Sequence, residues 1–249
     1  MASRAQEKEQ LRQHRLEAEE RDRVRQKRLT RLAGAATALT VCIVATLIVL
    51  SGGGSAPGPV QGVAEVAERL GGIEQHGALL GRAGTRPTVV EFGDLQCPVC
   101  KTYSASVVAE LIDGPVRAGE ARLEFRSWPI LGPDSREAGA AAYAAAEQNR
   151  LWNFVELFYR NQGTENSGYV TPAFLRAIAK GAGVPDLARW ERDRHAMHWA
   201  AVMAATETQA RAHGFSGTPS FAVLGPGGAK ALGTPHSAAE IEAALAEAG

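Results

Sequence analysis

The stretch VVEFGDLQCPVCKTY, residues 89–103, holds two cysteines at C-x-x-C spacing where an apolar run gives way to a helix. The run at 89–92 is β-branched and aromatic, which predicts a buried strand with Glu91 set into it. Glycine and aspartate at 93–94 then interrupt the strand. A C-x-x-C pair between a strand and a helix is typical of redox chemistry.

Pro98 follows Cys97, and proline is favoured at the first helical position because its missing N–H would be unpaired there. The apolar spacing is helical from 103 to 112, and Asp-Gly-Pro at 113–115 predicts the end of this helix. Cys97 is therefore expected to cap the helix N-terminus, with Cys100 one turn inside. The helix dipole stabilises a thiolate at Cys97, and Cys100 can then resolve the disulfides that Cys97 forms.

A structural disulfide and a zinc site are the alternatives for this pair. A zinc site needs further Cys or His ligands, and the third cysteine of the chain, Cys42, lies in an uncharged apolar stretch. A structural disulfide closing so small a loop would constrain the unfolded chain little. The sequence therefore favours a redox-active pair and predicts no metal and no cofactor.

The N-terminal region carries a charged tail followed by an apolar stretch. Residues 1–31 have 10 Lys/Arg and 6 Asp/Glu, although the whole chain has a formal charge of zero, which argues against a nucleic-acid partner. Residues 32–50 carry no charge, and at about 1.5 Å per residue they nearly span a hydrocarbon core of ~30 Å. We expect a single transmembrane helix at 32–50, with 1–31 in the cytoplasm and the remainder outside.

A cleaved signal peptide is the main alternative for this region. The apolar stretch is longer than the ~7–15 residues of a signal peptide, and Pro57 follows the only suitable small-residue site, at 54–56. An uncleaved anchor is therefore favoured, and a location outside the cytoplasm also permits disulfides. Residues 51–62, SGGGSAPGPVQG, are expected to form a flexible linker that reaches about 20 Å.

Residues 63–249 are expected to form one α/β domain. The patterns predict a helix at 63–70, irregular structure at 71–84, a strand at 121–128, a helical insertion at about 134–205, a hairpin with strands at 221–224 and 229–232, and a last helix. Asp134 is expected to cap the insertion's first helix, and a break is expected near His195. A three-layer α/β sandwich accommodates this order.

Three features of residues 63–249 point to one family. The motif Cys-Pro-Val-Cys at 97–100 is preceded by Val-Glu-Phe at 90–92 and followed, after the helical insertion, by Gly-Thr-Pro-Ser-Phe at 217–221. In these motifs the chain resembles the DsbA-like thiol–disulfide oxidoreductases of the thioredoxin superfamily. The resemblance implies a thioredoxin-like fold with a helical insertion, here preceded by the predicted transmembrane helix.

The resemblance also implies roles for single residues. Cys97 matches the exposed nucleophile and Cys100 the resolving thiol of the redox-active disulfide. Pro219 matches a cis-proline that faces this pair, with Thr218 beside it, and Glu91 matches an acidic residue buried beneath the disulfide. A merely structural turn is the alternative for Pro219. Because proline lacks an N–H, a backbone edge stays available there, to which an unfolded polypeptide can add as a strand.

Two departures from the family pattern limit what the resemblance implies. The residues between the cysteines are Pro98-Val99, where the strongly oxidising members have Pro-His. Only the linker and one short helix precede the fold, so nothing resembles the dimerisation domain of the disulfide isomerases.

We therefore expect a membrane-anchored, extracytoplasmic oxidoreductase that forms disulfide bonds in unfolded or cysteine-containing secreted and envelope polypeptides. A membrane redox partner is expected to reoxidise it. One alternative is a reductase that delivers electrons to a dedicated partner, as in cytochrome maturation. Another is a binding or chaperone module whose cysteines form only a stabilising bridge, and the presence of both the Cys-Pro-Val-Cys and Thr-Pro motifs argues against it.

Overall fold

The computed structural model describes residues 58–84 and 87–248. The charged tail 1–31, the predicted transmembrane helix 32–50 and linker residues 51–57 lie outside this part of the chain, so these assignments stay predictions. No helix within the described residues is long and apolar enough to cross a membrane.

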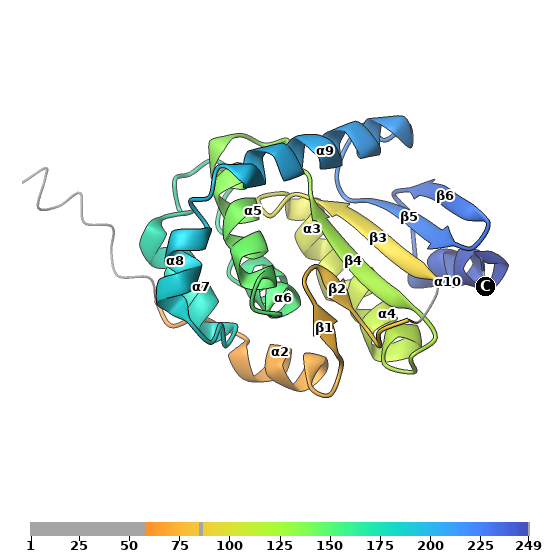
Figure 1. Cartoon of the computed structure of the whole chain (residues 1–249), viewed down its shortest axis with the longest axis horizontal. Coiled ribbons are helices and arrows are strands. Elements are labelled where there is room, and N and C mark those ends of the chain that lie inside the picture. Colours follow the sequence, from red (N-terminus) through yellow and green to blue (C-terminus); the bar gives the residue numbers. More distant parts are fainter. Residues whose placement is uncertain (1–57, 85–86, 249) are drawn as a thin grey trace, which may run out of the picture. The chain divides into compact units, whose positions relative to one another are not determined.

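A six-stranded sheet lies at the centre of the described domain, with the strand order β1-β2-β4-β3-β5-β6 (Figure 1). The strands are β1 (Gln75–His76), β2 (Leu79–Leu80), β3 (Thr88–Gly93), β4 (Arg122–Ser127), β5 (Ser220–Gly225) and β6 (Gly228–Gly233). β3 and β4 are parallel, and every other neighbouring pair is antiparallel. The predicted strand at 121–128 and the predicted hairpin after 220 are both present.

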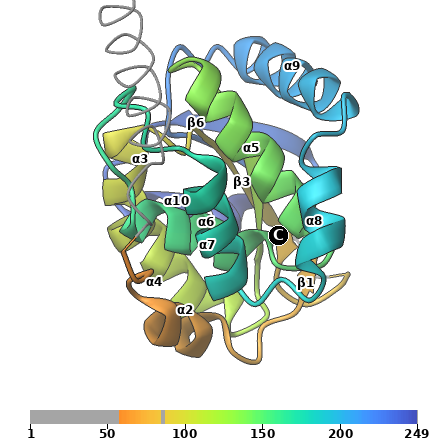
Figure 2. The ribbon, with the colours of Figure 1, turned by 90° about the vertical axis from the view of Figure 1, so that its left-hand side faces the viewer.

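The helices are α2 (Val63–Leu70), α3 (Pro98–Tyr103), α4 (Ala109–Leu111), α5 (Pro133–Ala146), α6 (Leu151–Arg160), α7 (Pro172–Gly181), α8 (Leu187–Asp193), α9 (His198–Ala212) and α10 (Ala238–Ala248). Two π-helical segments follow these helices: η1 (Ser104–Val108) lies between α3 and α4, and η2 (Ile112–Val116) follows α4. The predicted helical insertion comprises α5 to α9, between β4 and β5, and α5 to α8 pack together as a bundle (Figure 2).

β3 is one of the two central strands, and all six of its residues are buried. Alternate side chains of a strand point to opposite faces of the sheet. Val89 therefore joins the larger core, which includes residues of α6 and α10, whereas Val90 and Phe92 pack with Ala210 of α9 in a smaller core on the other face. Burial on both faces fixes β3, and with it the position of the cysteine pair that follows.

Two local predictions were wrong. The segment 71–84, predicted to be irregular, contains the β1–β2 hairpin, whose strands of two residues are too short to show a pattern and which is held by pairing of β2 with β4. Asp134 does not cap α5: Gly132 is the N-cap residue, and Pro133, whose fixed φ suits the first helical position, starts the helix. The predicted end of the helix at 113–115 is confirmed by the backbone of Gly114, which is not helical (φ −97°, ψ −109°) and separates the helix after the cysteines from the short turn that follows.

Other expectations are confirmed. The helix at 63–70 is present with the predicted bounds. The helical pattern breaks near His195, since α8 ends at Asp193 and α9 begins at His198.

Candidate active site

Cys97 occupies the N-cap position of α3, as the sequence predicted. Pro98 takes the first helical position, and the sulfur of Cys97 accepts a hydrogen bond from the backbone N–H of Cys100 at 3.4 Å. Cys97 Sγ is thus held against the positive end of the helix, where backbone N–H groups favour negative charge. The two thiols are not joined by a disulfide in this structure.

The two thiols have different electrostatic environments. The pKa of Cys97 is lowered to about 6, chiefly by a hydrogen bond from the Cys100 side chain, against the opposing effect of burial. Hydrogen bonds from the backbone N–H groups of Cys100 and Val99 lower the pKa of Cys97 further. Burial raises the pKa of Cys100 well above its usual value. A thiolate at neutral pH is therefore favoured on Cys97 and disfavoured on Cys100.

Thr218 and Pro219 lie beside Cys97 although 121 residues separate Thr218 from it along the chain. The peptide bond between Thr218 and Pro219 is cis. The Cys97 thiol donates a hydrogen bond to the carbonyl oxygen of Thr218, with 3.4 Å between sulfur and oxygen. The fold thus brings the Cys-Pro-Val-Cys and Thr-Pro motifs together.

Glu91 lies in β3 and is 1% exposed. Its Oε1 has no hydrogen-bond partner among the described residues. Burial first, and then the negative charges of Glu156 and Cys97, raise the pKa of Glu91 to about 8. A carboxyl group in this position is favoured in its protonated form at neutral pH.

Asp94 organises the loop between β3 and α3, a role that the sequence analysis missed. Its Oδ1 accepts a hydrogen bond from Gln96 N at 2.9 Å, and its Oδ2 accepts bonds from Ile130 N at 2.8 Å and Leu131 N at 2.9 Å. The first of these bonds closes a turn of the kind that aspartate favours, a signal that was available in the sequence. The other two tie the cysteine loop to the loop after β4.

The helical insertion also holds this loop. Gln162 donates from Nε2 to the carbonyl oxygens of Leu95 at 2.7 Å and Cys97 at 3.1 Å. Gln96 donates to Ser135 Oγ at 3.0 Å. Gln162 and Ser135 lie far along the chain from the cysteines, so no local pattern of the sequence indicated that they bond to this loop.

Two apolar side chains beside the thiol pair are exposed to solvent. Val99, between the cysteines, is 49% exposed, and Ile130, whose N–H binds Asp94, is 44% exposed. Both side chains are therefore accessible to another molecule at this surface.

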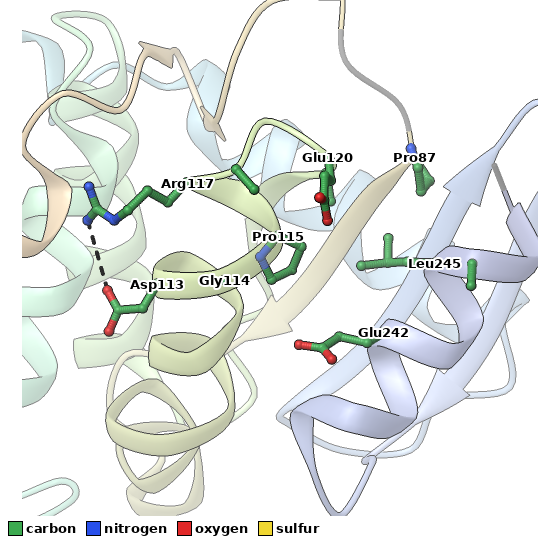
Figure 3. A pocket seen from close by; sticks show the side chains of 11 residues that line it. Pro87, Asp113, Gly114, Pro115, Arg117, Glu120, Glu242 and Leu245 are labelled. Carbon is green, nitrogen blue, oxygen red and sulfur yellow. Dashed lines mark ion pairs between the residues drawn. The ribbon is translucent and has the colours of Figure 1, made fainter.

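A cavity of about 1000 Å³ lies elsewhere, between α10 and the segment around η2 (Figure 3). Its lining includes Pro87, Leu245, Glu242 and the ion-paired Asp113 and Arg117. Pro87 directly precedes β3, whereas the cysteines follow the other end of that strand. The cavity and the thiols are therefore at opposite ends of β3.

The described residues contain no group of three or more His, Cys, Asp or Glu side chains suited to hold a metal ion. The sequence-based expectation that the protein needs neither metal nor cofactor stays a prediction.

Comparison with known proteins identifies similar chains. A family model described as "Thioredoxin" matches residues 74–247. The probable disulfide bond formation protein D of Bacillus cereus is 29% identical over 150 residues, which is 59% of this chain and 69% of that protein.

Two solved structures extend the comparison. A thioredoxin-like oxidoreductase from Silicibacter pomeroyi is 33% identical, with a TM-score of 0.56, and the match covers 68% of this chain and 90% of that one. Oxidised BdbD from Bacillus subtilis gives a TM-score of 0.60 at 21% identity, covering 70% of this chain and 96% of that one. At that identity the likeness to BdbD is one of fold.

Proposed function

Since this chain belongs to the thioredoxin family and is a DsbA-like thiol–disulfide oxidoreductase, we propose that it oxidises cysteine pairs in secreted or envelope proteins through Cys97 and Cys100. The observation that carries this proposal is the asymmetry of the two thiols. Cys97 caps a helix and has a pKa of about 6, whereas Cys100 is fully buried and its pKa is raised. A stabilised thiolate makes the corresponding disulfide a better oxidant.

The reaction starts from the oxidised enzyme, with a bond between Cys97 Sγ and Cys100 Sγ. A substrate thiolate attacks Cys97, which forms a mixed disulfide, and Cys100 leaves with the electron pair and takes up a proton. A second substrate thiolate then attacks the substrate sulfur of the mixed disulfide and releases Cys97 as a thiolate. The substrate loses two electrons, which the enzyme gains and passes to a membrane redox partner.

Glu91 is the proposed proton donor to Cys100. Its buried carboxyl group has a pKa raised to about 8, and its negative charge would raise the pKa of Cys100. The group therefore holds a proton at neutral pH close to the sulfur that must accept one. Because Glu91 starts protonated, the opening of the disulfide leaves one negative charge in the buried site instead of two, and proton transfer moves that charge from Cys100 to Glu91.

Substrate binding is proposed at the surface around Thr218 and Pro219. An extended polypeptide would add to the backbone edge there, with Val99 and Ile130 as apolar contacts. Pro98 starts α3 and so supports the position of Cys97. The exposure of the two apolar side chains and the contact between Cys97 and Thr218 support this arrangement.

Membrane attachment is part of the proposal. Residues 1–31 would be cytoplasmic, and residues 32–50 would anchor the chain in the membrane. Residues 51–62 would link this anchor to the domain at 63–249, which would act outside the cytoplasm. The uncharged stretch and its basic flank in the sequence support this topology.

The experiment mixes the oxidised full-length protein with a reduced, unfolded protein substrate and follows the loss of free thiols without another oxidant. We expect two substrate thiols to be lost for each enzyme disulfide consumed, and no loss with Cys97→Ser. Unchanged substrate thiols with the wild-type protein would contradict the proposal.

A further inference from the structure

A second buried carboxyl group lies behind the redox centre. Glu156, on α6, is 2% exposed, and its Oε1 accepts a hydrogen bond from Ser104 Oγ at 2.7 Å. Ser104 follows α3 directly, and its backbone N–H bonds to the carbonyl oxygen of Cys100. Glu156 is therefore fixed to the redox helix one turn below Cys100.

Glu91 approaches the same region from the sheet, and Gly93 leaves room for it. A Cβ atom at Gly93 would lie 3.2 Å from Glu91 Oε1, 3.2 Å from the hydroxyl oxygen of Tyr159 and 2.7 Å from Phe125. Tyr159 lies one turn after Glu156 on α6, and its hydroxyl donates to the carbonyl oxygen of Asp94 at 3.3 Å. α6, a helix of the insertion, thus places the polar side chains of Glu156 and Tyr159 beneath the thiol pair.

The surroundings of Glu156, unlike those of Glu91, include groups that stabilise its charged form. Burial raises the pKa of Glu156, but the hydrogen bond from Ser104 and the positive charges of Arg69 on α2 and Arg160 on α6 oppose this rise. Asp113 of η2 is the charged group that acts against ionisation of Glu156.

No positive group among the described residues offsets the burial of Glu91. The groups that interact with it are Glu156, Cys97, Cys100 and Tyr159, and each is neutral or negative. When two carboxyl groups interact in a buried site, the first negative charge is favoured on the group that has a hydrogen-bond donor and nearby positive charges. Here that group is Glu156.

We propose that Glu156 is a positioning residue of the redox centre, whose carboxylate keeps Glu91 protonated and so keeps a proton ready for Cys100. This inference rests on the proposed function. When the Cys97–Cys100 bond opens, the electron pair goes to Cys100 Sγ and the proton moves from Glu91 to that sulfur. Glu156 takes part only through its charge.

The test is a pH titration of the side-chain carboxyl carbons by ¹³C NMR in the full-length protein labelled at glutamate. Glu91 is assigned from its missing signal in Glu91→Gln. In the wild type we expect Glu91 to titrate near pH 8, and in Glu156→Gln at a pH lower by about 1 unit or more. Ser104→Ala, which removes only the hydrogen bond, should lower the midpoint by a smaller amount.

Glu110→Gln is the matched control, because it removes one exposed carboxylate from α4 and should leave the Glu91 midpoint unchanged. A Glu91 midpoint that is the same in wild type, Glu156→Gln and Ser104→Ala would overturn the inference. The titration reads Glu91 directly and needs no disulfide exchange, so its outcome is separate from that of the thiol-loss experiment.

A kinetic measurement adds a second readout. The rate at which dithiothreitol opens the enzyme disulfide at pH 7 should fall in Glu156→Gln, since a smaller fraction of Glu91 holds its proton at that pH. In the Glu91→Gln background the same substitution should have no further effect. An equal fall in both backgrounds would mean that Glu156 does not act through Glu91.

Discussion

The thiol of Cys97 donates a hydrogen bond to the carbonyl oxygen of Thr218, with sulfur and oxygen 3.4 Å apart. A carbonyl oxygen accepts a hydrogen bond but cannot donate one, so this contact exists only while Cys97 is protonated. Once the proton leaves, the sulfur keeps its bonds from Cys100 and the Thr218 carbonyl loses its donor. In the thiolate form, that carbonyl is free to accept a hydrogen bond from the backbone of a substrate.

The first prediction concerns the pKa of Cys97, which should be found near 6 from the ultraviolet absorbance of the thiolate as a function of pH. The Cys100 side chain is the largest cause of the lowered pKa, so Cys100→Ala should raise it. Cys100→Ser keeps a donor at this place and should raise the pKa less. Equal pKa values in both variants and the wild type would contradict the assigned cause.

The second prediction is that Cys100→Ser accumulates mixed disulfides with substrates through Cys97, because the resolving thiol is gone. The adducts are detected in cells as species that a reductant removes from non-reducing gels. Cys97→Ser is the matched variant and should give none, since Cys100 is fully buried. Adducts on Cys100 instead would reverse the roles of the two cysteines.

The third prediction concerns stability. The folded-state pKa of Glu91, about 8, lies above its ordinary value of 4.5, so its contribution to stability is fully present below pH 4.5 and is lost as the pH rises towards 8. Glu91→Gln should therefore raise the free energy of unfolding at pH 7 by about 3 kcal/mol.

Denaturant unfolding at several pH values checks this prediction. The increase in the free energy of unfolding caused by Glu91→Gln should become smaller as the pH falls to 4.5. A gain that does not change with pH would show that the carboxyl group is not titrating between these limits.

The fourth prediction concerns the clamp between the insertion and the cysteine loop. Gln162→Ala removes two hydrogen bonds to backbone carbonyls, which should cost about 1 kcal/mol locally and speed amide exchange at Cys97 and Cys100 about fivefold. Gln148→Ala is the control, because Gln148 also bonds to backbone, at Asp186, but lies on an exposed part of the insertion. The same acceleration in both variants would argue against a specific clamp.

The sequence was most informative where local chemistry decides the structure. Cys97 followed by Pro98 predicted the helix cap, and the β-branched run before it predicted the buried strand. Glu156 could not be found in this way, because a glutamate on a helix ordinarily faces solvent and α6 is buried on nearly all sides. Gln96 and Gln162 bond to groups that only the folded insertion brings close, so their roles depend on tertiary contacts that no spacing reveals.

The direction of electron flow was also only partly predictable. The helix N-terminus favours the Cys97 thiolate and hence an oxidant, whereas Val99 adds neither charge nor hydrogen bond where the strongly oxidising members carry histidine. A negative charge on Glu91 would oppose the thiolate, although its raised pKa keeps it mostly protonated at pH 7. We therefore expect an intermediate reduction potential, with oxidation sustained by a membrane partner.

The most direct test of the central claim is the redox state of the Cys97–Cys100 pair in growing cells. Rapid acid quenching followed by alkylation of free thiols separates the oxidised and reduced forms by mass, and a strain expressing the Cys97→Ser, Cys100→Ser protein gives the reference without the pair. An enzyme that forms disulfides should be found mainly oxidised. A pair found mainly reduced would contradict this account and indicate a reductase supplied by an electron donor.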